Sequence, residues 1–179
     1  KRMLEREPLL RPAGMTGGII YYDCVTDDAR LTLENALAAA RLGATIVTRA
    51  DVCAIDDTHE KNGLAHVEFE DRIGRRRVTV SAKCVVNCTG AWTDRTRRLA
   101  VDCDGVVRPT KGVHLVIARE RLPLHHANAL IVPRDGRVFF AIPWNDRVGV
   151  GTTDTDFAGD PANVGIEVPD VEYLLAAAN

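Results

Sequence analysis

The sequence has no uninterrupted apolar run close to the roughly 20 residues that a membrane-spanning helix requires, and it carries no secretory signal pattern. Its 179 residues include 23 Lys and Arg against 25 Asp and Glu, which gives a formal net charge of −2. A protein whose main partner is nucleic acid usually presents a strongly basic face, so this balance argues against nucleic acid as a partner. Hydrophobic residues make up 46% of the chain, which is enough for a globular core.

The two common phosphate-binding glycine loops, GxGxxG and GxxxxGK(S/T), are also absent. If the protein binds a dinucleotide, the main phosphate loop therefore lies outside this chain. The five cysteines are an odd number, so they cannot all pair, and most of them fall in apolar stretches. We expect buried free thiols in a reducing compartment. We expect no metal site, because Cys84 and Cys88 lack the spacing of a metal-binding knuckle.

The pattern of the chain predicts an α/β fold in which helical and extended segments are mixed. The chain begins at Lys1 rather than at a methionine and stops at Asn179 within a helical pattern, so we expect an internal piece of a longer protein. Residues 26–104 predict part of a parallel α/β layer. Residues 1–25 contribute a strand to a second part, and residues 105–179 form the rest of it as a mostly antiparallel sheet followed by a helix.

The clearest helix is Thr26–Leu42, whose first residue can cap it and whose following glycine can end it. Its alanine-rich face suits close packing on a sheet. Two apolar runs predict short strands of a parallel sheet, Ala44–Thr48 and Lys83–Cys88. We expect the second of these to be buried on both faces and to turn at Thr89-Gly90 into a helix over residues 91–100.

Alternating or β-branched segments predict further strands, mostly antiparallel. They are Gly17–Cys24, Leu64–Glu70, Arg77–Ser81, Ala129–Pro133, Val138–Pro143 and Arg147–Val150. Asp135-Gly136 and Asn145-Asp146 are the kind of dipeptide that forms tight hairpin turns. Pro169–Ala178 predicts a final helix. We also expect Trp144, at the end of its strand, to lie in the core.

Three places in the sequence could carry chemistry. His114 is a polar residue within an apolar strand, so it is either an ordinary sheet histidine or a general base or ligand, with Lys111 nearby to attract an anion. Thr152-Thr153-Asp154 is either a plain turn after a strand or the polar wall of a ligand pocket. Thr89-Gly90 could present backbone N–H groups to a nucleotide, although any strand-to-helix turn favours glycine.

Five segments taken together and in this order resemble the FAD-dependent glycerol-3-phosphate dehydrogenases of the D-amino-acid-oxidase-like flavoprotein superfamily. They are YYDCVTDDARL, NCTGAWTD, RPTKGVHLV, VFFAIPW and VGVGTTDTDF. The resemblance covers residues 15–179. It implies an FAD-binding three-layer domain that includes residues 26–104, and a substrate-binding antiparallel sheet. The family's GxGxxG segment and its C-terminal part, which supplies arginines for the substrate phosphate, are not in this chain.

The resemblance also implies roles for individual residues. Val52 matches a position whose backbone meets the adenine end of FAD, and the turn beside the flavin is matched by Thr89, Gly90, Ala91 and Trp92. Cys88 stands where the family usually has alanine. His114 matches the active-site histidine and is the implied catalytic base. The implied substrate-binding residues are Lys111, His114, Thr153 and Asp154.

The implied reaction is oxidation of sn-glycerol 3-phosphate to dihydroxyacetone phosphate, with FAD as cofactor and a membrane quinone as electron acceptor. We expect the parent protein to be cytoplasmic and peripheral to the inner membrane. We expect this piece alone to be inactive and to bind FAD weakly or not at all. Three alternatives stay open: an oxygen-using glycerophosphate oxidase, a flavin oxidase acting on an amine or a 2-hydroxy acid, and a non-catalytic domain that keeps the fold.

Overall fold

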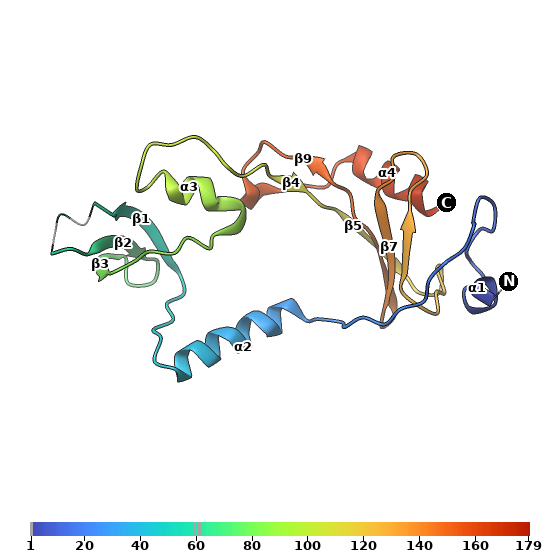
Figure 1. Cartoon of the computed structure of the whole chain (residues 1–179), viewed down its shortest axis with the longest axis horizontal. Helices are drawn as coiled ribbons and strands as arrows, with labels where there is room; N and C mark the ends of the chain where they lie inside the picture. The colour runs from blue at the N-terminus through green and yellow to red at the C-terminus, as the bar shows by residue number, and fades with distance from the viewer. Residues whose placement is uncertain (1, 59, 61) are drawn as a thin grey trace. The chain divides into compact units, whose positions relative to one another are not determined.

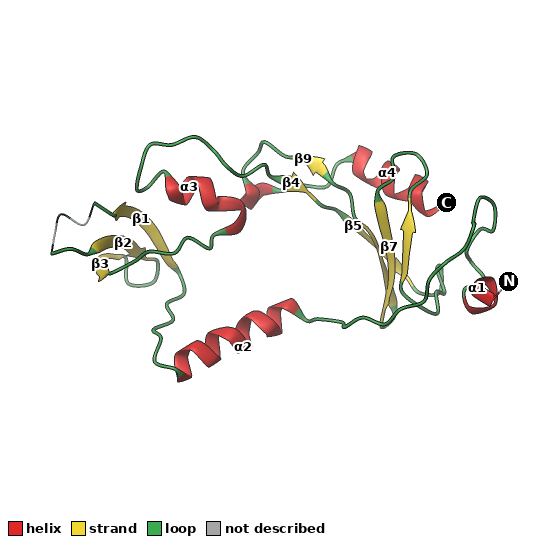
Figure 2. Cartoon of the chain, in the orientation of Figure 1, coloured by secondary structure: helices red, strands yellow, loops and turns green. Residues whose placement is uncertain are grey.

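The structure, a computed structural model, describes residues 2–58, 60 and 62–179. The chain divides into two compact units. Unit 1 combines the residues up to Ile20 with Arg108–Asn179, and unit 2 is Tyr21–Val107. Figure 1 follows the chain from end to end, and Figure 2 marks its helices and strands. The mixed helix and strand content confirms the predicted fold class.

The centre of unit 1 is a four-stranded antiparallel sheet in the order β5-β8-β7-β6. Its strands are β5 (His114–Ala118), β6 (Asn128–Ile131), β7 (Val138–Trp144) and β8 (Arg147–Gly151). Both predicted hairpins are confirmed, because Gly136 and Asn145 adopt the positive φ angles, 74° and 53°, that tight turns require. These turns fix the register, so alternate side chains of each strand share one face of the sheet.

Helix α4 (Val168–Ala178) covers one face of this sheet and closes the core of unit 1. Phe139, Val148, Val150 and Leu174 are its largest fully buried side chains. The sequence predicts this helix correctly, and Leu174 lies on its buried face, 0% exposed, whereas Leu175 is exposed. Burying a leucine side chain stabilises a fold by about 1.5–3 kcal/mol, so this contact is a main support of α4 on the sheet.

The remaining elements of unit 1 are short. They are α1 (Arg2–Arg6), β4 (Thr110–Lys111), β9 (Thr155–Asp156) and η2 (Pro161–Asn163), and β4 pairs with β9. Glu7, which is only 3% exposed, connects the first residues to a later loop. Its carboxylate accepts hydrogen bonds from the backbone N–H groups of His125 and His126, at 3.0–3.3 Å. The N-terminal segment is therefore part of the fold of unit 1.

Unit 2 contains a three-stranded antiparallel sheet in the order β1-β2-β3. Its elements are α2 (Asp28–Arg41), β1 (Ala50–Asp56), β2 (Ala65–Asp71), β3 (Arg76–Ala82), η1 (Gly90–Trp92) and α3 (Thr93–Arg97). The two strands predicted from alternation, β2 and β3, are confirmed. Helix α2 is also confirmed, but its cap is Asp27 rather than Thr26, since the Asp27 carboxylate accepts a hydrogen bond from the backbone N–H of Arg30 at 3.0 Å.

Three predicted strands are wrong. Gly17–Cys24, Ala44–Thr48 and Lys83–Cys88 have no strand pairing within the part of the chain that the structure describes. A buried strand needs neighbours for its backbone N–H and C=O groups, and the described sheets do not extend to these segments. The helix predicted over residues 91–100 is also shorter, being the single 3₁₀ turn η1 followed by α3.

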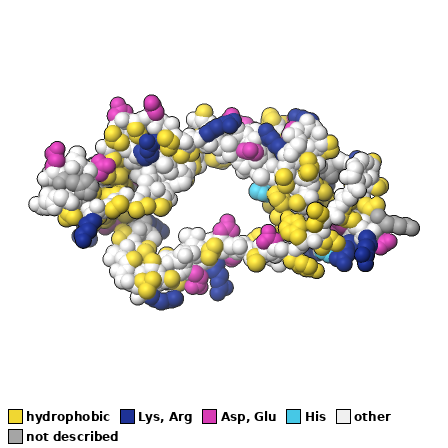
Figure 3. All heavy atoms as spheres, in the orientation of Figure 1, with side chains coloured by type: hydrophobic (Ala, Val, Ile, Leu, Met, Phe, Trp, Pro, Cys, Tyr) yellow, Lys and Arg dark blue, Asp and Glu magenta, His cyan; other side chains and the backbone are white. Residues whose placement is uncertain are grey.

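The predicted packing of α2 and of the cysteines is wrong as well. None of the α2 residues is buried, and Leu31, Leu33 and Leu37 are exposed. Figure 3 shows hydrophobic side chains on the visible surface over α2 and over the four-stranded sheet. The five cysteines are free, but none is fully buried: three are exposed and two are half-buried. The expected apolar surroundings are missing because the strands that would have supplied them do not form.

Candidate functional site

His114 begins β5 and lies on the sheet face opposite α4. The register pairs His114 with Gly151 and pairs Gly151 with Phe140, so these residues form one row across the sheet. The side chains of His114 and Phe140 are exposed. A Cβ atom built on Gly151 would lie 2.8 Å from Cδ2 of His114 and 2.8 Å from the carbonyl oxygen of Val113. Only a glycine at this position leaves room for the imidazole to lie against β8.

Among the described residues, the sheet face that carries His114 is open and mostly apolar, with the charged side chain of Arg147 at its far end. Its exposed side chains include Val116, Phe140, Ile142 and Trp144. The prediction that Trp144 belongs to the core is wrong, because its side chain is 56% exposed. Pro143 does not interrupt the pairing of β7 with β8, which continues through Trp144 and Arg147. The face therefore places an imidazole among mostly apolar side chains.

Lys111, predicted to attract an anionic substrate, has an environment that leaves little room for that role. Its side chain is only 6% exposed. Its ammonium lies 2.8 Å from the Asp170 carboxylate and 3.1 Å from the Glu167 carboxylate, and it is 3.4 Å from the carbonyl oxygen of Gly165. The hydrogen bond to Asp170 is the main reason that the pKa of Lys111 is raised above its ordinary value of 10.5.

Thr153 is also used inside the protein. It is buried, and its hydroxyl oxygen accepts a hydrogen bond from the backbone N–H of Val113 at 2.9 Å. The same hydroxyl donates to the carbonyl oxygen of Lys111 at 3.4 Å. Thr153 therefore fixes the backbone immediately before His114. Its predicted contact with substrate stays a prediction.

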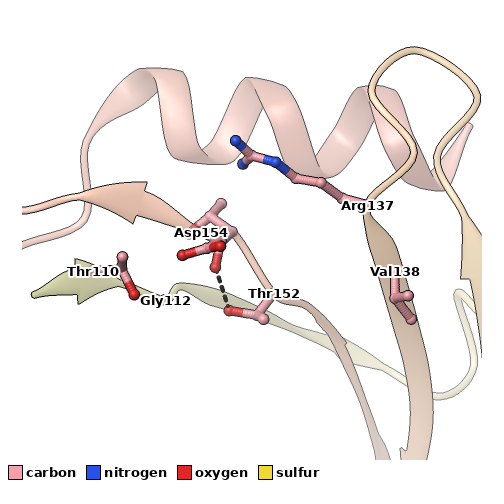
Figure 4. Close-up of a pocket in the computed structure, with 7 residues that line it drawn as sticks. Thr110, Gly112, Arg137, Val138, Thr152 and Asp154 are labelled. Atoms are coloured by element: carbon pink, nitrogen blue, oxygen red, sulfur yellow. Dashed lines mark hydrogen bonds between the residues drawn. The ribbon is translucent and has the colours of Figure 1, made fainter. Parts of the chain in front are cut away.

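A pocket of about 500 Å³ lies beside this turn and is formed entirely by unit 1. It is lined by Thr110, Gly112, Arg137, Val138, Thr152, Thr153 and Asp154 (Figure 4). Asp154 is exposed and faces the pocket, as the prediction of a polar wall requires. The Thr152 hydroxyl donates to the carbonyl oxygen of Thr153 at 2.9 Å, so the turn is braced from within. His114 does not line this pocket.

Arg137 is the pocket residue that the sequence did not single out. It follows the β6–β7 turn, and its guanidinium lies 5.8 Å from the centre of the Tyr173 ring and 3.7 Å from the Asp135 carboxylate. The Tyr173 hydroxyl donates to Asp135 at 3.1 Å. Burial, followed by this hydrogen bond, raises the pKa of Tyr173 above 10.0. The contact with α4, distant in sequence, is what brings Arg137 to the pocket wall.

In unit 2 the predicted cofactor turn, Thr89–Trp92, is exposed. Gly90 has a φ angle of 56°, and open space surrounds the position where a Cβ would stand. The Thr89 hydroxyl donates to the Asn87 side chain at 2.7 Å, and the Thr93 hydroxyl donates to the carbonyl oxygen of Gly90 at 2.7 Å. A rigid, exposed glycine turn fits the close approach of a nucleotide to the backbone.

Two other features of unit 2 concern the cofactor prediction. Val52, predicted to meet the adenine end, is 42% exposed in β1 next to an irregularity in the pairing with β2. Asp94, which follows the turn, was not predicted to have a role. Its carboxylate accepts hydrogen bonds from the backbone N–H groups of Val106 and Val107 at 3.0–3.1 Å, which lower its pKa below 3.8. Asp94 thereby holds the segment that leaves unit 2.

The structure thus groups the predicted substrate residues Lys111, His114, Thr153 and Asp154 in unit 1. The predicted cofactor residues Val52 and Thr89–Trp92 lie in unit 2. Among the described residues, no cluster of three or more His, Cys, Asp or Glu side chains is arranged to hold a metal ion. No described helix has the length and apolar character needed to cross a membrane.

Comparison with known proteins gives consistent results. The chain is 39% identical over 183 aligned residues to an alpha-glycerophosphate oxidase of Enterococcus casseliflavus, a match that covers 100% of this chain and 30% of that protein. It is 36% identical over 182 residues to an aerobic glycerol-3-phosphate dehydrogenase of Staphylococcus saprophyticus, covering 100% of this chain and 32% of the relative. The chain therefore spans about a third of the length of these relatives.

The fold is similar to the crystal structure of a glycerol-3-phosphate dehydrogenase from Bacillus halodurans complexed with FAD. The TM-score is 0.89 at 39% sequence identity, and the match covers 99% of this chain and 36% of that structure. Residues 1–179 also match the family described as DAO, FAD dependent oxidoreductase. This match extends over the whole sequence, and the chain belongs to the DAO family of FAD-dependent oxidoreductases.

Proposed function

We propose that the protein to which this chain belongs oxidises sn-glycerol 3-phosphate to dihydroxyacetone phosphate with FAD as its cofactor. The observation that carries the proposal is the exposed imidazole of His114, which lies against Gly151 on an open sheet face. The chain is 39% identical to a protein named alpha-glycerophosphate oxidase, which supports the choice of substrate.

His114 is the general base in this proposal. It accepts the proton of the C2 hydroxyl, which allows the C2–H bond to break and the carbonyl to form. A bound FAD would supply the acceptor for the two electrons and the hydrogen of that bond. Asp154, exposed at the pocket, can accept hydrogen bonds from substrate hydroxyls.

The residues that would hold FAD in this chain are Val52 and the turn Thr89–Trp92, through their backbones. Their exposure and the open space at Gly90 support this assignment. The main phosphate loop is not in this chain, since no GxGxxG occurs in it. We therefore expect the isolated chain to bind FAD weakly or not at all and to be inactive. Stoichiometric flavin absorption in the purified chain would contradict this expectation.

For the electron acceptor we propose a membrane quinone, with the protein cytoplasmic and peripheral to the inner membrane. The similarity to proteins named dehydrogenase supports this choice. Molecular oxygen is the second candidate, because other relatives at 35–39% identity are named oxidase. Hydrogen peroxide formation in air, compared with reduction of a soluble quinone without oxygen, separates the two acceptors in the full-length protein.

The substrate is tested by turnover of the full-length protein. Oxidation of glycerol 3-phosphate supports the proposal. Oxidation of an amine or a 2-hydroxy acid, with no oxidation of glycerol 3-phosphate, would overturn it. His114→Ala is expected to lower kcat by about 100-fold or more, since general bases contribute factors of that order. Unchanged turnover in this variant would make His114 an ordinary sheet residue. Absence of any turnover in the wild type would favour a non-catalytic domain.

A further inference from the structure

The ion pair between Lys111 and Asp170 is the most buried pair of opposite charges among the described residues of unit 1. The two side chains are 6% and 5% exposed, and their charged atoms are 2.8 Å apart. The Lys111 ammonium has three N–H donors, and three acceptors surround it: Asp170, Glu167 and the carbonyl oxygen of Gly165. No donor is left for a further ligand. Asp170 in turn accepts the backbone N–H of Glu167 at 2.9 Å, within the capping box that begins α4.

The backbone of Lys111 is also held, through its carbonyl oxygen. Its carbonyl oxygen accepts hydrogen bonds from the hydroxyls of Thr153 and Thr155, each at 3.4 Å. The next residues are Gly112 and Val113, and the backbone N–H of Val113 donates to the Thr153 hydroxyl at 2.9 Å. His114 follows directly. A continuous series of hydrogen bonds therefore connects the first turn of α4 with the residue that carries the imidazole.

We propose that Lys111 and Asp170 are positioning residues that hold the backbone of His114 in place, and that Lys111 does not contact the substrate. This inference rests on the proposed function only in assigning catalysis to His114. The ion pair joins α4, which is fixed to the sheet by Leu174, to the short strand β4. Without the pair, β4 keeps its pairing with β9 and the hydrogen bonds from Thr153 and Thr155, but it loses its ionic connection to Asp170 of α4. The start of β5 would then lose a fixed support.

The alternative is that Lys111 binds the anionic substrate through its charge, as predicted from the sequence. For that the ammonium would have to leave Asp170, a carboxylate that is 5% exposed. A buried charge that loses its partner is strongly unfavourable, so substrate binding at Lys111 would be opposed by the fold itself. The two assignments differ in measurable ways, because a ligand contributes to KM and a positioning residue contributes to kcat.

The experiment compares Lys111→Met, Asp170→Asn and the double variant Lys111→Met/Asp170→Leu in the full-length protein with FAD bound. We expect each to lower kcat by about 10- to 100-fold, since a displacement of about 1 Å can cost that much, while KM for glycerol 3-phosphate stays within about twofold. The double variant should lose no more than the single ones, because all three break the same connection. Glu172→Gln, an exposed carboxylate on the same helix, is the matched control and should match the wild type.

The double variant also guards against a simple loss of folding. Its two apolar side chains replace the buried charges, which preserves stability in many proteins, so reduced kcat in a folded double variant is a positioning effect. The proposal is overturned if Lys111→Met raises KM and leaves kcat unchanged, or if Asp170→Asn keeps the wild-type kcat.

A measurement independent of turnover separates this proposal from the proposed function. In protein labelled with ¹³C at histidine, the imidazole resonance of His114 is identified by its absence in His114→Ala. We expect this resonance to shift in Asp170→Asn and not in Glu172→Gln. An unmoved resonance in Asp170→Asn refutes the positioning role, whatever the substrate is. Conversely, a shifted resonance in a protein that does not oxidise glycerol 3-phosphate would refute the proposed function alone.

Discussion

Replacing Gly151 by alanine should displace His114. The new methyl group would lie 2.8 Å from the carbonyl oxygen of Val113 and 2.8 Å from Cδ2 of the imidazole, both well inside ordinary contact distance. The imidazole can rotate, but the carbonyl belongs to the backbone that enters β5, so the strand itself has to move. Overpacking of this kind costs about 1–3 kcal/mol of stability. The reduced freedom of the unfolded chain returns about 0.4–1 kcal/mol of it.

Gly149→Ala is the matched control, since Gly149 lies two residues earlier in β8 on the same face. Its new methyl group would come no closer than 3.9 Å to the carbonyl oxygen of Ile142, an ordinary contact. We therefore expect Gly149→Ala to be as stable as the wild type or slightly more stable. The two alanine variants should differ by about 2 kcal/mol, which is the overpacking cost at position 151, because the gain from the unfolded chain is common to both variants and cancels.

The assay is thermal unfolding of both variants together with their steady-state kinetics in the full-length protein. We expect Gly151→Ala to unfold at a lower temperature and to lose about 10- to 100-fold in kcat through displacement of the imidazole, whereas Gly149→Ala keeps both properties. Equal stability and equal turnover in the two variants would refute the steric reasoning. Lower stability with unchanged kcat would show that the strand moves without carrying the base with it.

Three further predictions concern stability. Leu174→Ala should cost about 2–5 kcal/mol because its side chain is 0% exposed between α4 and the sheet, while Leu175→Ala on the exposed side should change the unfolding midpoint very little. Thr153→Val should cost about 1–3 kcal/mol, since it leaves a buried backbone N–H unpaired, and Thr153→Ser should restore most of that loss in a denaturant titration. Two backbone N–H groups lower the pKa of Asp94 below 3.8, so its contribution is complete above pH 3.8 and disappears as the pH falls through the lower folded value. Asp94→Asn should flatten this acid limb of the stability profile, and an unchanged limb would contradict the assignment.

Local signals explain which parts of the fold could be predicted. Asp135-Gly136 and Asn145-Asp146 specify tight turns by themselves, and the alternation of β7 then decides which side chains face α4. Ala44–Thr48 has a composition as typical of a strand as that of β7, but it forms no strand, because a strand depends on a partner elsewhere in the chain. Composition indicates whether a segment suits a strand, but it does not show whether the segment has a strand to pair with.

The same distinction applies to the site. His114 could be predicted because the signal is local: its imidazole is a polar group flanked on both sides by apolar residues of the same strand. The true environment of Lys111 could not, since Asp170 belongs to a helix that begins much later in the chain. The position of Arg137 at the pocket could not be predicted for a similar reason, because it depends on Tyr173 of that helix. Charges acquire their roles from partners that only folding brings together.

The buried carboxylate of Glu7 has a consequence for how the chain is made. Its hydrogen-bond partner His125 lies 118 residues further along, beyond the whole of unit 2. At a synthesis rate of about 5–20 residues per second, roughly 6–24 seconds pass between the appearance of the acid and that of its partner on the ribosome. Unit 2 can form its local hairpins in that interval, whereas unit 1 cannot fold until its second segment, Arg108–Asn179, has been synthesised. The order of synthesis therefore favours early folding of the inserted unit and late closure of the unit that carries His114.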